Sequence, residues 1–98
     1  MFTVRRLPEF DLWLRSLRDV PTRIRLARRL ERAKRGNLGD VKPLGDGVFE
    51  MREFFGPGWR MYYVERKGVL IVMVGGGDKA SQRSDIATAR QRAANLVE

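Results

Sequence analysis

Residues 48–79 read VFEMREFFGPGWRMYYVERKGVLIVMVGGGDK, and their pattern predicts three consecutive antiparallel strands. Apolar and charged residues alternate at the start of this stretch, which is the period of a strand with one buried face. The apolar positions are Phe49, Met51 and Phe55, and the charged positions are Glu50 and Arg52. Residues 69–74 form a continuous apolar run, as expected for a strand that is buried on both faces.

Glycine and proline mark the turns between these strands. Residues 56–58 (Gly-Pro-Gly) separate the first strand from residues 59–66, and Lys67-Gly68 separates the second strand from the apolar run. If Met51 and Met61 point into the core, the alternation brings three other side chains together on the opposite face of two adjacent strands. These side chains are Arg52, Arg60 and Tyr62.

Length and composition restrict the classes of function. The 98 residues make one domain, and a net charge of +8 favours polyanionic partners, either nucleic acid or an acidic protein. The absence of cysteine excludes a disulfide framework and a thiolate metal site, and it suits a reducing cytoplasm. Because histidine is absent too, any catalysis must depend on Arg, Lys, Tyr, Asp or Glu. We expect no membrane span and no signal peptide.

Two helices are predicted before the sheet. The first follows Pro8 and ends near Asp19, and the second runs from Pro21 to a glycine stop at Gly36. Because the connection between them is short, they should form an antiparallel hairpin that packs on the sheet. The apolar stripe expected for the second helix consists of Ile24, Ala27, Leu30 and Ala33, with Leu26 beside it.

The second helix carries much of the positive charge. Residues 1–36 hold eleven Lys and Arg against four Asp and Glu. The basic residues that fill the rest of this helix are Arg23, Arg25, Arg28, Arg29, Arg32, Lys34 and Arg35. Such a helix is either a nucleic-acid-binding surface or a solvated face with long side chains. The candidate RNA-binding residues are Arg23, Arg28, Arg32 and Arg35, together with Arg83 near the C-terminus.

Three glycines, residues 75–77, follow the apolar run and precede Asp78-Lys79. The spacing does not fit a phosphate-binding loop, so we expect these glycines to let the backbone pass close to another group at the end of the sheet. A final helix, capped by Ser81 or Ser84, is predicted to extend through Val97. Its alanines suggest close approach to a neighbouring surface.

The order of elements predicts an α+β fold. A first strand at residues 2–5 precedes the helical hairpin, and residues 37–47 form a loop with a brief extended piece at residues 41–44. The sheet is expected to be small, twisted and mainly antiparallel, with the hairpin on one face and a C-terminal helix. The face opposite the hairpin is then expected to be only partly covered.

Three motifs occur in a fixed order along the chain: Glu50-Met51-Arg52, then Gly-Pro-Gly-Trp-Arg-Met-Tyr-Tyr at residues 56–63, then Gly77-Asp78-Lys79 with Gln82 and Asp85-Ile86 following. In that order and spacing they resemble the RelE/ParE superfamily of toxins from bacterial toxin–antitoxin modules. The resemblance covers nearly the whole chain and is greatest for the addiction-module killer proteins, near the HigB-like toxins. It implies a RelE-like fold for residues 1–98.

Nucleases of this superfamily cleave mRNA in the ribosomal A site, and the resemblance implies the same activity here without a metal ion or other cofactor. By position, Arg52 and Arg60 correspond to basic sheet residues of the family, and Lys79 corresponds to its lysine after the last strand. Arginine can neutralise a phosphate, and Lys79 can act as an acid or base where neighbouring arginines disfavour its protonated form. Tyr62 is the fourth candidate catalytic residue, as a proton donor or stacking surface.

Other interpretations of these residues stay open. Arg52 is alternatively an ion-pair partner of Glu50 or Glu53, and Tyr62 is alternatively an aromatic residue covered by the last helix. The chain has no histidine and no tyrosine after Tyr63, whereas some family nucleases use a tyrosine near the C-terminus. A ParE-like toxin that inhibits DNA gyrase without cutting RNA is therefore an alternative, as is a non-toxic basic nucleic-acid-binding module.

The resemblance also implies the partners of the protein. They are an antitoxin, expected to be a helix-turn-helix protein encoded next to it, and the ribosome with its mRNA. No membrane is involved, and the expected location is the cytoplasm.

Overall fold

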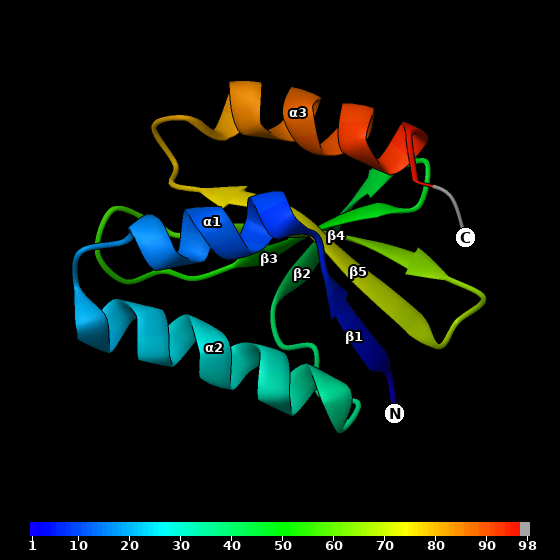
Figure 1. Ribbon diagram of the computed structural model, residues 1–98, viewed down its shortest axis with the longest axis horizontal. Helices are drawn as coiled ribbons and strands as arrows, with labels where there is room; N and C mark the ends of the chain where they lie inside the picture. The colour runs from blue at the N-terminus through cyan, green and yellow to red at the C-terminus, as the bar shows by residue number, and fades with distance from the viewer. Residues whose placement is uncertain (97–98) are drawn as a thin grey trace.

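Within residues 1–96, which the computed structural model describes, five strands form one sheet and three helices cover it (Figure 1). Along the chain the elements are β1 (Thr3–Arg6), α1 (Pro8–Ser16), α2 (Val20–Lys34), β2 (Val41–Gly45), β3 (Val48–Arg52), β4 (Arg60–Arg66), β5 (Leu70–Gly77) and α3 (Gln82–Ala94). The order of strands in the sheet is β1-β5-β4-β3-β2. The predicted α+β fold with a mainly antiparallel sheet is confirmed.

Strands β2 to β5 are antiparallel neighbours, and β1 pairs with β5 in parallel. The extended piece predicted inside a loop is in fact the edge strand β2. It joins β3 through Asp46 and Gly47, whose φ angles of 56° and 76° are both positive. A two-residue hairpin turn of this kind requires positive φ at both positions, and Asp-Gly is one of the sequences that favour it.

One face of the sheet packs against α1 and α2. The buried residues of the two helices on this face are Phe10, Leu14, Leu26, Leu30 and Ala33. They contact strand residues that point to the same side, namely Met51, Met61, Tyr63, Ile71 and Met73. Each large apolar side chain buried in this way stabilises the fold by about 1.5–3 kcal/mol. The predicted hairpin and the predicted core positions Met51 and Met61 are confirmed.

The buried stripe of α2 differs from the predicted one. Ile24 is 46% exposed, whereas Leu26 and Leu30 are fully buried. The helix begins at Val20, one residue before Pro21, because Asp19 is its N-cap and accepts a hydrogen bond from the backbone N–H of Thr22. The face that the helix buries consists of Thr22, Leu26, Arg29, Leu30 and Ala33, so it includes an arginine that apolar periodicity could not select.

The opposite face of the sheet packs against α3 (Figure 1). Ala89 and Ala93 lie against the strand residues Val48, Tyr62, Val64, Val72 and Val74. Small alanine side chains let the helix approach the sheet closely, as expected. This face is covered more completely than predicted, and its polar residues Glu50 and Arg60 are only 1% and 6% exposed. The prediction that the last helix extends through Val97, a residue outside the described range, is wrong: α3 already ends at Ala94, with Asn95 as its C-cap.

Glycines at the end of β5 allow the close packing of both layers. Gly76 and Gly77 belong to the strand itself and do not follow it. A Cβ atom added to Gly76 would collide with the Trp13 ring, and one added to Gly77 would collide with the Asp85 carboxylate. The expected close approach is therefore confirmed, with α1 on one side of the strand and α3 on the other. No helix within residues 1–96 is long and apolar enough to cross a membrane.

Candidate functional site

Strands β3 and β4, together with the segment that follows β5, bring three of the predicted site residues to one end of the sheet. Arg52 and Arg60 are direct partners in the antiparallel register. The connection between the strands folds back at Gly58, whose φ is +82°. A Cβ atom added to Gly58 would lie 3.3 Å from the Cβ of Lys79 and 3.6 Å from Nη1 of Arg60. The base of the Lys79 side chain and the Arg60 guanidinium thus both lie beside Gly58, and Arg52 is the cross-strand partner of Arg60. We call these three residues the basic cluster.

Arg60 is held in place rather than exposed. Its Nη1 donates hydrogen bonds to the carbonyl oxygens of Glu53 and Trp59, at 3.1 Å and 3.0 Å. Its Nε lies 3.8 Å from Oε1 of Glu50. The side chain was expected on a partly open face, but it is buried because the first turns of α3 cover this end of the sheet. A guanidinium fixed by three neighbours presents its positive charge in one position.

Glu50 is a site residue that sequence reasoning missed. Its side chain is 1% exposed and accepts a 2.7 Å hydrogen bond from Nε2 of Gln82 on α3. The carboxylate therefore links α3 to Arg60, and a buried carboxylate of this kind needs both partners to offset its desolvation. The signals in the sequence were the Glu50-Met51-Arg52 motif and the position of an acidic residue directly between Phe49 and Met51, in a strand that lies inside the sheet.

Tyr62 lies beneath α3 and has no exposed surface. It is opposite Glu50 in the register, and its hydroxyl group makes no hydrogen bond of good geometry among the described residues. Burial, and then the negative charge of Glu50, raise the pKa of the Tyr62 hydroxyl above its usual value. The ring therefore offers no stacking surface to a ligand in this structure, and the interpretation as an aromatic residue covered by the last helix matches its position.

Arg52 and Phe54 form the accessible part of the cluster. The Arg52 side chain is 33% exposed and pairs with Asp40 at 3.1 Å, whereas the alternative interpretation paired it with Glu50 or Glu53. Phe54 is 74% exposed, and the guanidinium carbons of Arg52 and Arg60 lie 5.6 Å and 5.7 Å from its ring centroid. Sequence reasoning missed Phe54, which lies in the connection after the end of β3, where strand alternation gives no guide to exposure. A basic cluster with an exposed ring suits the binding of an unpaired nucleotide.

An uncharacterised protein of Haemophilus influenzae is 39% identical to this chain over 87 residues. The match covers 89% of this chain and 88% of that protein. The chain belongs to the same family as the Haemophilus protein. No family model matches this sequence, and no solved structure matches it.

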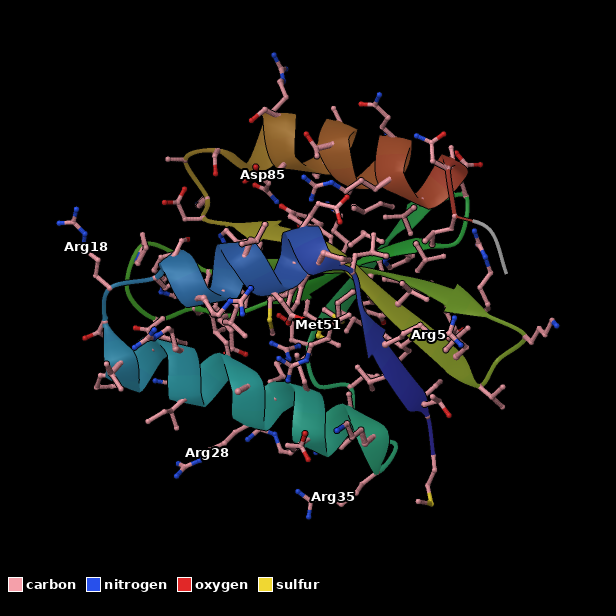
Figure 2. The ribbon with its side chains drawn as sticks, viewed as in Figure 1. Arg5, Arg18, Arg28, Arg35, Met51 and Asp85 are labelled. Atoms are coloured by element: carbon pink, nitrogen blue, oxygen red, sulfur yellow. The ribbon has the colours of Figure 1, made fainter. Side chains whose placement is uncertain are left out.

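The five predicted RNA-binding arginines of the present chain do not share one surface. Arg28 and Arg35 are exposed and point away from the sheet on the outer side of α2 (Figure 2). Arg83 lies on α3, which covers the other face of the sheet. Arg23 reaches the carbonyl oxygen of Arg15 at 3.5 Å. Arg32 lines a hollow that also includes Arg52, a residue of the basic cluster.

Arg29, expected among the surface arginines of α2, is 3% exposed. Its guanidinium donates hydrogen bonds to the carbonyl oxygens of Leu38, Asp40 and Arg52 and forms an ion pair with Glu53. Arg29 therefore fixes the loop before β2 to the end of β3, which positions Arg52. Burial of this charge is possible because the backbone supplies acceptors that are distant in sequence.

Proposed function

We propose that the protein is the toxin of a type II toxin–antitoxin module and cleaves mRNA on the ribosome in the cytoplasm. The observation that carries this proposal is the grouping of Arg52, Arg60 and Lys79 beside the exposed ring of Phe54. The resemblance of residues 50–86 to RelE/ParE toxins supports it, and so does the net charge of +8. On this proposal the α+β fold is the RelE-like fold.

Cleavage of RNA through its own 2′-hydroxyl defines the roles of the basic cluster. The 2′-hydroxyl gives its proton to the neutral amine of Lys79 as its oxygen attacks the adjacent phosphorus. The bond from phosphorus to the 5′-oxygen breaks, which leaves a 2′,3′-cyclic phosphate, and the leaving 5′-oxygen takes the proton back from Lys79. Negative charge grows on the pentavalent phosphate, and Arg52 and Arg60 stabilise it with hydrogen bonds and fixed charge. Arginine stays protonated, so Lys79 is the residue of the cluster that transfers a proton. Phe54 stacks against a base beside the cleaved bond.

On this proposal the ribosome orients the attacking 2′-hydroxyl, which the basic cluster alone does not do. A single proton-transferring side chain gives modest acid–base catalysis, whereas correct orientation of the attacking hydroxyl contributes several kcal/mol to rate, up to about 7–11 kcal/mol in well-oriented systems. The toxin is therefore expected to cut translated mRNA and to leave free RNA intact. Its antitoxin is expected to be acidic or amphipathic, because opposite charge speeds the encounter with a basic toxin.

Transcript mapping after brief induction tests this function. We expect new 5′ ends inside translated reading frames, and we expect these ends to disappear in Lys79→Ala. The matched control is Arg28→Ala, which removes one exposed charge on the far side of α2 and should leave the cuts in place. Unbroken mRNA together with accumulating double-strand DNA breaks would contradict the proposal, and a strain that grows normally after induction would favour a non-toxic binding module.

A second candidate function follows from one specific observation. Tyr62 is buried and the chain has no histidine, which leaves Lys79 without a second proton-transferring partner in the cluster. This arrangement also suits a ParE-like toxin that binds DNA gyrase and cuts nothing. Lys79→Arg separates the two functions, because it keeps the charge and removes the transferable proton. Toxicity that survives this substitution would favour gyrase binding, and toxicity that is lost would favour cleavage.

A further inference from the structure

A hollow of about 430 Å³ lies between α2, the loop before β2 and the end of β3. Four arginines and two carboxylates line it: Arg25, Arg29, Arg32, Arg52, Asp40 and Glu53. We call this hollow the arginine pocket. It adjoins the basic cluster through Arg52, and its lining includes neither Arg60 nor Lys79.

The arginine pocket carries more positive charge than its own carboxylates neutralise. Glu53 pairs with the buried Arg29, and Asp40 pairs with Arg52. Arg25 is 61% exposed and approaches Glu53 only to 3.9 Å. The exposed side chain of Arg32 has no hydrogen bond or ion pair within the described part of the chain. Four arginines against two carboxylates leave the pocket lining with a net charge of +2, which matches the charge of about −1.5 to −2 on a phosphate monoester at neutral pH.

Two donors in the wall of the pocket also lack acceptors. The Nε atoms of Arg29 and Arg52 are buried without a hydrogen-bond partner among residues 1–96. Buried N–H groups in proteins are nearly always paired, so an unpaired one calls for an explanation such as a ligand or an ordered water molecule. The other nitrogen atoms of Arg29 are held by Leu38, Asp40 and Glu53, so this buried arginine gives the pocket a fixed wall and a fixed positive charge.

Aromatic rings in the pocket lining indicate that the phosphate belongs to a molecule with a planar base. Phe54 and Phe55 both contribute to the pocket lining. The Arg25 guanidinium lies over the Phe55 ring at 3.9 Å, so this ring is already occupied. Phe54 is 74% exposed and offers a free face beside Arg52. A planar base can stack on such a ring while its phosphate reaches the arginines.

We propose that the arginine pocket binds the phosphate monoester of a nucleotide, with the base stacked on Phe54. The nucleotide is either a free mononucleotide or the phosphorylated end of an RNA strand, because both carry the same group. Arg25 and Arg32 supply the uncompensated charge, and Arg52 contacts the ligand from the end of β3. Binding at the arginine pocket requires neither the ribosome nor RNA cleavage, so it can be tested independently of the function proposed above.

Equilibrium titration of the purified full-length chain tests the pocket, with 5′-AMP, adenosine and inorganic phosphate as probes at near-physiological salt. We expect 5′-AMP to bind at least about 10-fold more tightly than either of the other probes, because it alone carries both groups. The double variant Arg25→Ala/Arg32→Ala should weaken 5′-AMP binding by about 10-fold or more. Phe54→Ala should reduce the affinity for 5′-AMP to that for inorganic phosphate.

The matched control is Arg28→Ala/Arg35→Ala. It removes the same charge from the same helix, but its side chains point away from the sheet (Figure 2). This control should keep 5′-AMP affinity within about 2-fold, since distant exposed charges are screened. Equal weakening in both double variants would overturn the proposal, because it would show attraction to the net charge alone. Adenosine that binds as tightly as 5′-AMP would overturn it as well.

A pair of short RNAs, one with a 5′-phosphate and one with a 5′-hydroxyl, distinguishes the two sources of the ligand. If the pocket takes an RNA end, the phosphorylated RNA should bind more tightly than both its hydroxyl counterpart and 5′-AMP. If it takes a free nucleotide, 5′-AMP should bind at least as tightly as the phosphorylated RNA. Either result upholds the site, provided that Arg25→Ala/Arg32→Ala abolishes the preference. A preference that survives this double variant would place the phosphate elsewhere and contradict the proposal.

Discussion

The Glu50 carboxylate lies 3.8 Å from Nε of Arg60, and both side chains are almost completely buried between the sheet and α3. Gln82 completes this arrangement with a 2.7 Å hydrogen bond to Glu50. Arg60, the most deeply buried arginine of the basic cluster, is thus also part of the packing between the sheet and α3. Removing it should affect both stability and activity.

Arg60→Ala is expected to destabilise the protein by about 3–5 kcal/mol, because Glu50 would stay buried without its ionic partner. Arg52→Ala should change the free energy of unfolding by less than about 1 kcal/mol, since its ion pair with Asp40 is partly exposed. Denaturant unfolding of the two variants measures this difference. If both substitutions lower the free energy of unfolding equally, the Glu50–Arg60 pair adds nothing to the stability of the fold.

The pattern of the sequence predicted most of the sheet but not its edge strand β2. Alternation over residues 48–66 and the apolar run at 69–74 identified β3, β4 and β5, because these strands have strong apolar faces. Strand β2 is short, is largely exposed and contains Pro43, so its apolar signal is weak. Asp46-Gly47 was the better signal for it, since that dipeptide favours a hairpin turn.

The candidate site was predicted less completely, because burial of a charged residue depends on distant partners. Alternation placed Arg52 and Arg60 on one face of adjacent strands, and the structure confirms that placement. It could not show that α3 covers Arg60, nor that the loop before β2 supplies acceptors to Arg29. Phe54 was missed for a related reason: exposure of a ring in a turn follows from the path of the chain and not from local sequence.

Gly76→Ala is expected to destabilise the protein by about 1–3 kcal/mol, because the added Cβ atom would overlap the Trp13 ring. Gly75→Ala is the matched control in the same strand. Its nearest neighbour would be Nη1 of Arg92 at 3.1 Å, which donates a 2.7 Å hydrogen bond to the carbonyl oxygen of Val74 and would have to shift by only a few tenths of an ångström. Thermal midpoints of the two variants test this contrast. A Gly76→Ala variant as stable as Gly75→Ala would contradict the close packing of α1 on β5.

Tyrosine ionisation should make the fold sensitive to strong alkali. Burial raises the pKa of the Tyr63 hydroxyl from 10.0 to about 12, and it raises that of Tyr62 as well. Because both pKa values are higher in the folded state, the resulting stabilisation is fully present below pH 10 and is lost as the pH rises toward the folded-state values. Unfolding free energies measured from pH 8 to 11 should therefore fall more steeply for the parent than for Tyr62→Phe/Tyr63→Phe. If the unfolding free energies of the parent and the double variant fall in parallel with pH, neither hydroxyl has a raised pKa in the folded state.

The most direct test of the central claim is a cleavage assay with purified ribosomes stalled on a defined mRNA. We expect the protein to cut that mRNA at the ribosomal A site and to leave the same RNA intact when ribosomes are absent. Lys79→Arg should lose the cut although it keeps its charge, and Arg28→Ala should cut as the parent does. An mRNA that stays intact on the ribosome, or one that is cut equally without it, would contradict the assignment of this basic cluster to ribosome-dependent RNA cleavage.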